Sequence, residues 1–450
     1  MKTYTIKIAA AIAAVAFISG QCVSPALAES EGGRPSTSLG LNETVTRALA
    51  TNEGLKIKDS ETLKSREVYK EARSGLLPHI SAQSSWTNYQ DYPASDDAKA
   101  DYMLSGGIAV SQLLWSFGKV TFAVSSSKRA AEALAYSREA GKNDVVYVAK
   151  LNYYSALLAK NSLMISQESY NNARDNKKLL EDRSAGGRSS KYEILKVDAD
   201  VASRVPSVNE ARAQYVTAME TLKSLIEARP EEEFDLTDVF KPEYADLDYN
   251  VLEAALLGRE PGLKSLGKAF EASQAAVNNK RAGFLPTLSA FANLDKSGKS
   301  NEATIPSRGS LSDYASIGLK VSVPLWEGGA TKAQLGQALA ERTAAQLRKD
   351  QARKALLLEL KKAFVEYLQY KDNLAANTEA VRLAGESFKQ MQEMFTSGQV
   401  TLTDLNAAEL LLTNQKINKE MTLFNVNVTL AKIEQLIAGE YNGSETSKQI

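Results

Sequence analysis

Cysteine and histidine are almost absent from this chain of 450 residues, which contains one of each. Cys22 lies in an N-terminal segment that we expect to be removed, so the mature chain has neither a disulfide framework nor a thiol nucleophile. His79 has no second histidine or cysteine with which to bind a metal, and the sequence has no phosphate-binding loop of the Walker type. The sequence therefore predicts no catalytic site, no metal and no cofactor, and a secreted hydrolase is the least favoured class of function.

The chain also lacks net charge and long apolar runs. Its 54 lysines and arginines balance 54 aspartates and glutamates, so charge gives no reason to expect a nucleic-acid partner. The apolar run at 8–18 is too short to span a bilayer, because a spanning helix needs about 20 apolar residues. We expect residues 1–28 to be a secretory signal peptide that is cleaved after Ala28. Gln21 stands where a lipoprotein signal requires a small residue, so we expect Cys22 to leave with this peptide.

A motif of nine residues occurs twice, and the rest of the chain is arranged around it. Val110–Gly118 reads VSQLLWSFG and Val321–Gly329 reads VSVPLWEGG, and their tryptophans are 211 residues apart. Further matches extend the repetition over nearly the whole mature chain. Internal repetition of this kind determines how the chain is divided into structural units. The predicted units are a first repeat at 29–228, a solvated acidic linker at 229–248, a second repeat at 249–438 and a polar tail at 439–450.

Apolar and polar residues alternate in two segments of each repeat, and a period of two is typical of β-strands. The face opposite the apolar one is small or polar, and aromatic rings stand near the strand ends, as in strands that cross an outer membrane. An ordinary two-sided sheet remains an alternative. The predicted strands are 78–90, 102–115, 285–297 and 314–326, and the expected membrane-interface aromatics are Trp86, Tyr102, Trp115, Tyr314 and Trp326.

Each pair of strands is followed by a helix of unusual length that contains no proline and carries an apolar heptad stripe, which is typical of coiled coils. After a glycine-containing turn, Ser190 and Thr401 are favourable N-caps for a return helix, and Glu193 and Asp404 stand in capping-box positions three residues later. The long helices are predicted at 119–184 and 330–397, and the return helices at 191–227 and 402–437.

Four strands in one protomer cannot close a barrel, and in lipid every strand edge must be paired. If the strands cross a membrane, association is therefore required. Three protomers would supply twelve strands, which is enough for a closed barrel with an open lumen. The predicted fold class is an elongated α+β protein with two internal repeats, in which a trimeric outer-membrane β-barrel with four strands per protomer is continued by a coiled-coil helical barrel.

The duplicated junction of strand, tryptophan, glycine and long helix resembles that of the TolC-like outer membrane channel proteins. The sequences Gly-Leu-Leu-Pro at 75–78 and Gly-Phe-Leu-Pro at 283–286, together with the turn at 398–404, are similar to the same family. The resemblance covers about 41–437 and implies a homotrimer with a twelve-stranded outer-membrane barrel and a periplasmic tunnel of coiled helices.

The resemblance also implies partners and a function. The partners would be outer-membrane lipid, a periplasmic adaptor (membrane fusion) protein and an inner-membrane ABC or RND transporter. Such a channel would be a passive exit duct for type I protein secretion, for small-molecule efflux or for both. A coiled-coil surface protein without a pore is the alternative function.

The periplasmic gate of the family matches this sequence in part. Asp404 matches an aspartate that lines the entrance, and Glu193 occupies the position of its acidic counterpart in the first repeat. Phe395 stands where a tyrosine is usual and Val400 where an arginine is usual, so a hydroxyl bond and an ionic latch are expected to be missing. We therefore expect a gate that depends mainly on packing, and capping of its own helix is the competing role for Asp404.

The two turns between long and return helices are the expected contact with the adaptor, because they form the far end of the helical tube and contain small residues. The expected docking residues are Gly186, Gly187, Arg188, Gly398, Val400 and Leu402.

Overall fold

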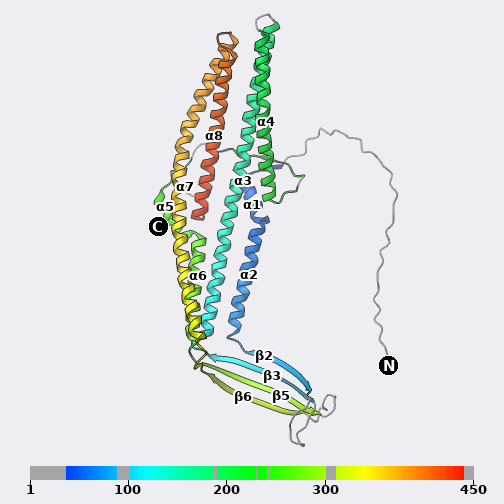
Figure 1. Cartoon of the computed structure of the whole chain (residues 1–450), viewed down its shortest axis with the longest axis vertical. Helices are drawn as coiled ribbons and strands as arrows, with labels where there is room; N and C mark the ends of the chain where they lie inside the picture. The colour runs from blue at the N-terminus through cyan, green and yellow to red at the C-terminus, as the bar shows by residue number, and fades with distance from the viewer. Residues whose placement is uncertain are drawn as a thin grey trace, which may run out of the picture.

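The chain is elongated, with a four-stranded sheet at one end and the ends of two helical hairpins at the other (Figure 1). The computed structural model describes residues 37–88, 102–185, 190–229, 231–240, 244, 246–300 and 311–439. The expected signal peptide and its cleavage after Ala28 lie outside the described residues, as do residues 440–450 of the expected polar tail. None of the described helices combines the length and apolarity that a membrane crossing requires.

The same order of six elements occurs twice, so the internal duplication of the sequence is a duplication of structure. In the first repeat these elements are α1 (Leu41–Thr51), α2 (Glu53–Ser74), β2 (His79–Asn88), β3 (Tyr102–Trp115), α3 (Lys119–Ala185) and α4 (Lys191–Leu225). In the second they are α5 (Tyr249–Arg259), α6 (Pro261–Ala282), β5 (Thr287–Ser300), β6 (Ser312–Ser322), α7 (Ala330–Thr396) and α8 (Leu402–Ile437). The helices α3 and α7 contain 67 residues each, so each extends for about 100 Å.

Each long helix begins just after a glycine in the left-handed conformation. Gly118 has a φ of 89° before α3, and Gly329 has a φ of 86° before α7. A side chain disfavours this conformation, and a Cβ atom at Gly118 would also lie 2.6 Å from the ring of Phe122. The turn from strand to helix therefore requires the glycine that ends both copies of the repeated motif.

The four long strands form one antiparallel sheet in the order β2-β3-β5-β6. The hairpin of the first repeat meets the hairpin of the second where β3 pairs with β5, and β2 and β6 form the two edges. Residues 89–101 and 301–310, which contain most of the loops between paired strands, lie outside the described residues.

Three strands have ends that differ from those expected from the sequence. The strand predicted at 314–326 is β6 and ends at Ser322, because Pro324 has no N–H group to donate to a ladder. Trp326 therefore lies beyond the sheet. The strand predicted at 285–297 is β5, which begins after Pro286 and continues to Ser300. The strand predicted at 78–90 is β2, whose described residues begin after Pro78 and end at Asn88.

The acidic segment between the repeats is not a simple solvated linker, and this expectation was wrong. It contains the short strand β4 (Phe234–Leu236), which pairs in parallel with β1 (Thr37–Leu39) from the start of the first repeat. Phe234 and Leu236 are buried, while Asp235 between them is exposed. Alternation of apolar and acidic residues hid a half-buried strand, because the acidic composition suggested solvent exposure throughout.

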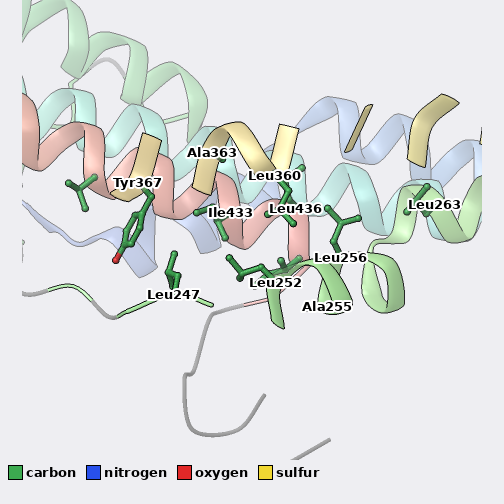
Figure 2. Packing of buried hydrophobic residues seen from close by; sticks show 12 residues of the cluster. Leu247, Leu252, Ala255, Leu256, Leu263, Leu360, Ala363, Tyr367, Ile433 and Leu436 are labelled. Carbon is green, nitrogen blue, oxygen red and sulfur yellow. The ribbon is translucent and has the colours of Figure 1, made fainter. Parts of the chain in front are cut away.

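Two apolar clusters hold the helices together near the middle of the molecule, one in each repeat. The cluster of the first repeat joins α1, α3, α4, β1 and β4 around Tyr153, whose hydroxyl donates to Leu39 O at 3.1 Å and to Asp238 Oδ2 at 2.8 Å. The cluster of the second repeat joins α5, α7 and α8. Figure 2 shows Leu360 and Ile433 beside Leu252 of α5, and Tyr367 beside Leu247, which precedes α5. The two repeats therefore have equivalent cores.

Shortening a buried side chain of β4 should destabilise the first-repeat core. We expect Phe234→Ala to cost about 3–5 kcal/mol of unfolding free energy, because a large aromatic side chain in a packed cluster is lost. Val239→Ala is the matched control, since Val239 is 81% exposed in the same segment and should change stability by less than ~0.5 kcal/mol. Thermal unfolding of the detergent-solubilised protein, followed by circular dichroism, measures both. Equal midpoints for the two variants would show that β4 is not part of the core.

Candidate functional site

The ends of the two hairpins pack against each other through an apolar cluster from four helices, which we call the tip cluster. Its buried members are Leu180 (α3), Val197 (α4), Phe395 (α7), and Leu402 and Leu405 (α8). Phe395 is only 3% exposed, so in this structure it packs between the hairpins and does not line an opening. Burial of Leu402 likewise removes it from the surface on which we expected docking.

A cation from the first hairpin holds the end of α7. The guanidinium of Arg183 in α3 lies 4.9 Å from the centre of the Phe395 ring and donates hydrogen bonds to the carbonyl oxygens of Phe395 and Thr396. A cation at a helix C-terminus is favourable, because the last carbonyls lack intrahelical partners. Val400 carries no charge, as its sequence indicates, and Arg183 supplies a cation to the tip from the other repeat.

Both return helices begin with a capping box. In α8, the Thr401 N–H donates to Asp404 Oδ2 at 3.0 Å and the Asp404 N–H donates to Thr401 Oγ1 at 3.4 Å. In α4, the Ser190 N–H donates to Glu193 Oε2 at 2.8 Å. Hydrogen bonds from Thr401, and more weakly the charge of Lys196, lower the pKa of Asp404 below its ordinary value. Asp404 and Glu193 thus act as caps in this structure, and their role as a gate stays a prediction.

The two expected docking turns are described unequally. Gly186, Gly187 and Arg188 lie outside the described residues. Gly398 has a φ of 80°, and no heavy atom lies within 4 Å of the position that its Cβ would take. Glycine at this turn is therefore required by the backbone conformation, and open space surrounds it.

A buried ion pair behind the tip cluster was not anticipated from the sequence. Glu409 in α8 is 1% exposed and accepts a hydrogen bond from Arg204 of α4, which also donates to Ser169 of α3. Thr413 Oγ1 donates to the other oxygen of Glu409 at 3.1 Å. Arg204 Nε lies 3.4 Å from Asp200 Oδ2 but forms no hydrogen bond. A sequence signal existed, because Glu409 occupies a heptad position between Leu405 and Leu412.

Polar links continue along the seam between the two repeats, where α3 lies beside α8 (Figure 1). Apolar clusters bind the helices within each repeat, and the tip cluster joins the two repeats at the hairpin ends. Between these regions, charged and amide side chains bridge α3 and α8. The bridges are Lys150 to Glu434 at 2.6 Å, Asn161 to Glu420 at 2.6 Å and Glu168 to Lys416 at 2.7 Å. The seam is therefore fixed by specific polar pairs, which specify the register of one repeat against the other.

The sheet at the other end of the molecule has one apolar and one polar face. Paired residues of antiparallel strands project from the same face, so the register assigns every position. The apolar face contains Ile80, Trp86, Leu104, Ile108, Leu294, Ile317, Leu319 and Val321. The polar face contains Ser81, Gln83, Ser105, Ser111, Asn293, Asp295, Ser316 and Lys320. Ile317 is 87% exposed and Leu319 is 68% exposed, so the apolar face has no cover in the single chain.

Three of the five expected interface aromatics lie on the apolar face. Trp86 and Tyr102 stack there with ring centres 5.5 Å apart. A β-bulge at Leu114 shifts the register of β3, so that Trp115 pairs with Leu288 and joins the same face. Tyr314 differs from these three, because it pairs with Asp295 on the polar face, and its place at the membrane interface stays a prediction.

The spacing of the aromatic residues matches the thickness of a membrane. Trp115 stands in the row of Leu288, and Trp86 stands in the row of Leu104 and Gly298. Ten residues of β5 separate these rows, which is about 33 Å at ~3.3 Å per residue. For strands tilted by about 40°, the height is roughly 25 Å, which is the height of the apolar band on outer-membrane barrels.

The family comparison agrees with this geometry. The family model described as outer membrane efflux protein matches residues 45–227 and 252–439, which is most of each repeat. The chain belongs to the outer membrane efflux protein family. It is similar to the alkaline protease secretion protein AprF of Pseudomonas aeruginosa, with 28% identity over 41% of this chain and 39% of AprF. It is also similar to the outer membrane efflux protein BepC of Brucella suis, with 23% identity over 68% of this chain and 66% of BepC.

These matches span from about two fifths to just under two thirds of the lengths of AprF and BepC. Among solved structures, the outer-membrane channel CmeC of Campylobacter jejuni has a TM-score of 0.74 at 19% identity, covering 91% of this chain and 88% of CmeC. The outer membrane protein VceC of Vibrio cholerae has a TM-score of 0.75 at 16% identity, covering 89% of this chain and 97% of VceC. The TolC-like fold is thus shared over nearly the whole described chain.

Removing one partner of the buried ion pair should destabilise the hairpins. We expect Glu409→Ala to cost about 3–5 kcal/mol, because Arg204 stays buried and loses its closest counter-charge, keeping only the longer contacts with Asp200. Replacing both partners, as Arg204→Met with Glu409→Leu, should recover most of this loss. Glu379→Ala is the control, since Glu379 pairs with Arg382 on the surface and such pairs contribute about 0–1 kcal/mol. Denaturant unfolding monitored by circular dichroism measures all three, and a Glu409→Ala loss no larger than that of Glu379→Ala would contradict the assignment.

The cap at Asp404 should depend on pH in one direction. The pKa of Asp404 is lowered in the folded chain. The contribution of its carboxylate to the stability of the fold is therefore complete above the ordinary aspartate pKa and is lost as pH falls through the lowered pKa. Residues 402–408 of the wild type should therefore show equal protection from hydrogen exchange at pH 7 and pH 6, after correction for intrinsic rates.

The Asp404→Ala variant should fray at both pH values, because it has no carboxylate to accept the Thr401 N–H. Gln399→Ala is the control outside the capping box. Wild-type protection in Asp404→Ala would show that the start of α8 does not need this cap.

Proposed function

We propose that three copies of this chain form an outer-membrane duct that is continued through the periplasm by the helices. The observation that carries the proposal is a sheet with an exposed apolar face, an opposite polar face and two edge strands. Such a sheet is satisfied in lipid when the apolar face meets the acyl chains and the edges are paired. The polar face then lines a water-filled lumen.

The strand directions support closure by copies of the same chain. The sheet has an even number of strands, all antiparallel, so β2 and β6 run in opposite directions. The β6 edge of one copy can therefore pair with the β2 edge of the next in the antiparallel sense found in outer-membrane barrels. Three copies give twelve strands. With strands ~4.8 Å apart and tilted by about 40°, the barrel radius is roughly 12 Å.

The long helices lead from this barrel to the proposed periplasmic entrance. Each copy contributes two hairpins whose ends are held by the tip cluster, by Arg183 and by the pair of Arg204 with Glu409. Asp404 and Glu193 would form rings of carboxylates at this entrance in addition to capping their helices. Phe395 belongs to the packing that holds the entrance and not to its lining.

We propose that the hairpin ends dock a periplasmic adaptor protein and that an inner-membrane transporter of the ABC or RND class supplies the energy. The open turn at Gly398 and the corresponding turn of the first hairpin, with Gly186, Gly187 and Arg188, are the proposed contacts. Val400 is half-buried beside the turn. The duct itself is passive, with no catalytic group and no cofactor. Relatives named for protease secretion and for efflux support either a protein or a small molecule as cargo.

Two neighbouring residues of β6 test the proposal. Ile317→Lys should abolish assembled outer-membrane trimers, because a lysine on the lipid face near the middle of the bilayer costs about 2–4 kcal/mol per copy. Ser316→Lys, one residue away on the polar face, should still give trimers that conduct ions in planar bilayers.

Membrane fractionation, native electrophoresis and single-channel recording measure these outcomes. Equal assembly of both variants would point to an ordinary two-sided sheet. Trimers without conductance would favour a coiled-coil surface protein that has no pore.

A further inference from the structure

The polar face of the sheet distributes its charges unequally along the strands. Among its described residues, Asp295 and Lys299 lie in the half away from the helices, and Lys320 lies in the half next to them. Lys320 pairs with Ser289, two residues before the end of β6. Asp295 is six rows further along β5, which is about 20 Å at ~3.3 Å per residue.

Lys320 has no counter-charge in the described chain. Its side chain is exposed, and none of the ion pairs formed by the described residues includes it. By contrast, Lys296 on the apolar face pairs with Asp313 at 2.9 Å. The residue equivalent to Lys320 in the first repeat is Ala109, 211 positions earlier, so each chain contributes one such charge.

Closure of the barrel would not supply a counter-charge from the strands. The strand that meets β6 across the proposed protomer boundary is β2, whose described sequence HISAQSSWTN contains no acidic residue. The next strand, β3, contains none either. Three lysines would therefore stand around the lumen of a barrel whose backbone radius is roughly 12 Å. The Debye length at 0.1 M salt is about 10 Å, so the field of these charges reaches most of the lumen cross-section but not the row of Asp295.

We propose that Lys320 is a specificity-determining residue of the duct, and that its three copies form a cationic ring that attracts anionic solutes such as carboxylates and phosphate esters. This inference rests on the proposed trimeric pore. A ring of like charge in a lumen raises the local concentration of counter-ions and selects among solutes. The ring lies at the periplasmic end of the barrel, where solutes pass from the helical tunnel into the membrane segment.

A cysteine reporter measures the local potential independently of the periplasmic entrance. Ser289→Cys places a thiol on the polar face in the row of Lys320, and the single native cysteine lies in the expected signal peptide. Intact cells are treated with methanethiosulfonate reagents that carry either a sulfonate or a trimethylammonium group. The ratio of the two reaction rates reports the potential at the thiol.

Adding Lys320→Gln to the reporter should lower the anion-to-cation rate ratio by about five- to tenfold, as expected for loss of a unit charge ~5–6 Å away in aqueous surroundings. Lys296→Gln is the matched control and should leave the ratio unchanged, because Lys296 is on the apolar face and is paired. A second reporter at Ser297, in the outer half of the polar face, should not respond to Lys320→Gln.

The possible failures are distinguishable. If Ser289→Cys reacts in intact cells but its rate ratio is the same with and without Lys320, the cationic ring is refuted and the pore stands. If the thiol reacts with neither reagent until the protein is denatured, the polar face is not a lumen, and both the ring and the proposed function are overturned.

Discussion

The unpaired backbone groups along the outer edges of β2 and β6 are the constraint on which the rest of the structure depends. A water-exposed edge is tolerable, but an edge in lipid leaves N–H and C=O groups without partners at a cost of several kcal/mol each. A chain with four strands and an uncovered apolar face is therefore incomplete alone. The duplication of a two-strand unit also determines how copies can pair. In a sheet with an even number of antiparallel strands, the two edge strands run in opposite directions, so the edges of two copies can pair antiparallel.

The helical part solves a different problem, because it has to be rigid within each repeat and specific between repeats. Apolar packing within a repeat is non-directional and supplies stability. The contacts between the repeats also use paired polar side chains, both along α3 and α8 and between Arg204 of α4 and Glu409 of α8, which is 1% exposed. Such pairs add little net stability but penalise every register in which they are broken. The hairpin ends are thus held in one arrangement by contacts that are costly to break singly.

The repeated architecture, the four strands and the eventual fold family could be predicted from the sequence, because they follow from period-two alternation, heptads and the duplicated tryptophan–glycine junction. The predictions failed where a residue's partner lies far along the chain. Tyr314 stands near a strand end, as an interface aromatic does. Neighbouring residues of β6 point to opposite faces, and only the pairing of Tyr314 with Asp295 shows that it lies on the polar face. Phe234 and Leu236 were hidden by acidic neighbours, and burial of Phe395 and Leu402 depends on contacts with the other repeat. Capping roles for Asp404 and Glu193 were local and predictable, and their role at the entrance stays a prediction.

The equal length of α3 and α7 fixes the distance between the sheet and the hairpin ends. Both helices contain 67 residues, and both hairpin ends share one apolar cluster, so their reach from the sheet has to agree. Inserting one helical turn into α3 alone would push the first hairpin about 5.4 Å beyond the second and separate Arg183 from the carbonyls that it caps. A change of span is therefore tolerated only when α3, α4, α7 and α8 change together. The length of the helical region is therefore set jointly by both repeats.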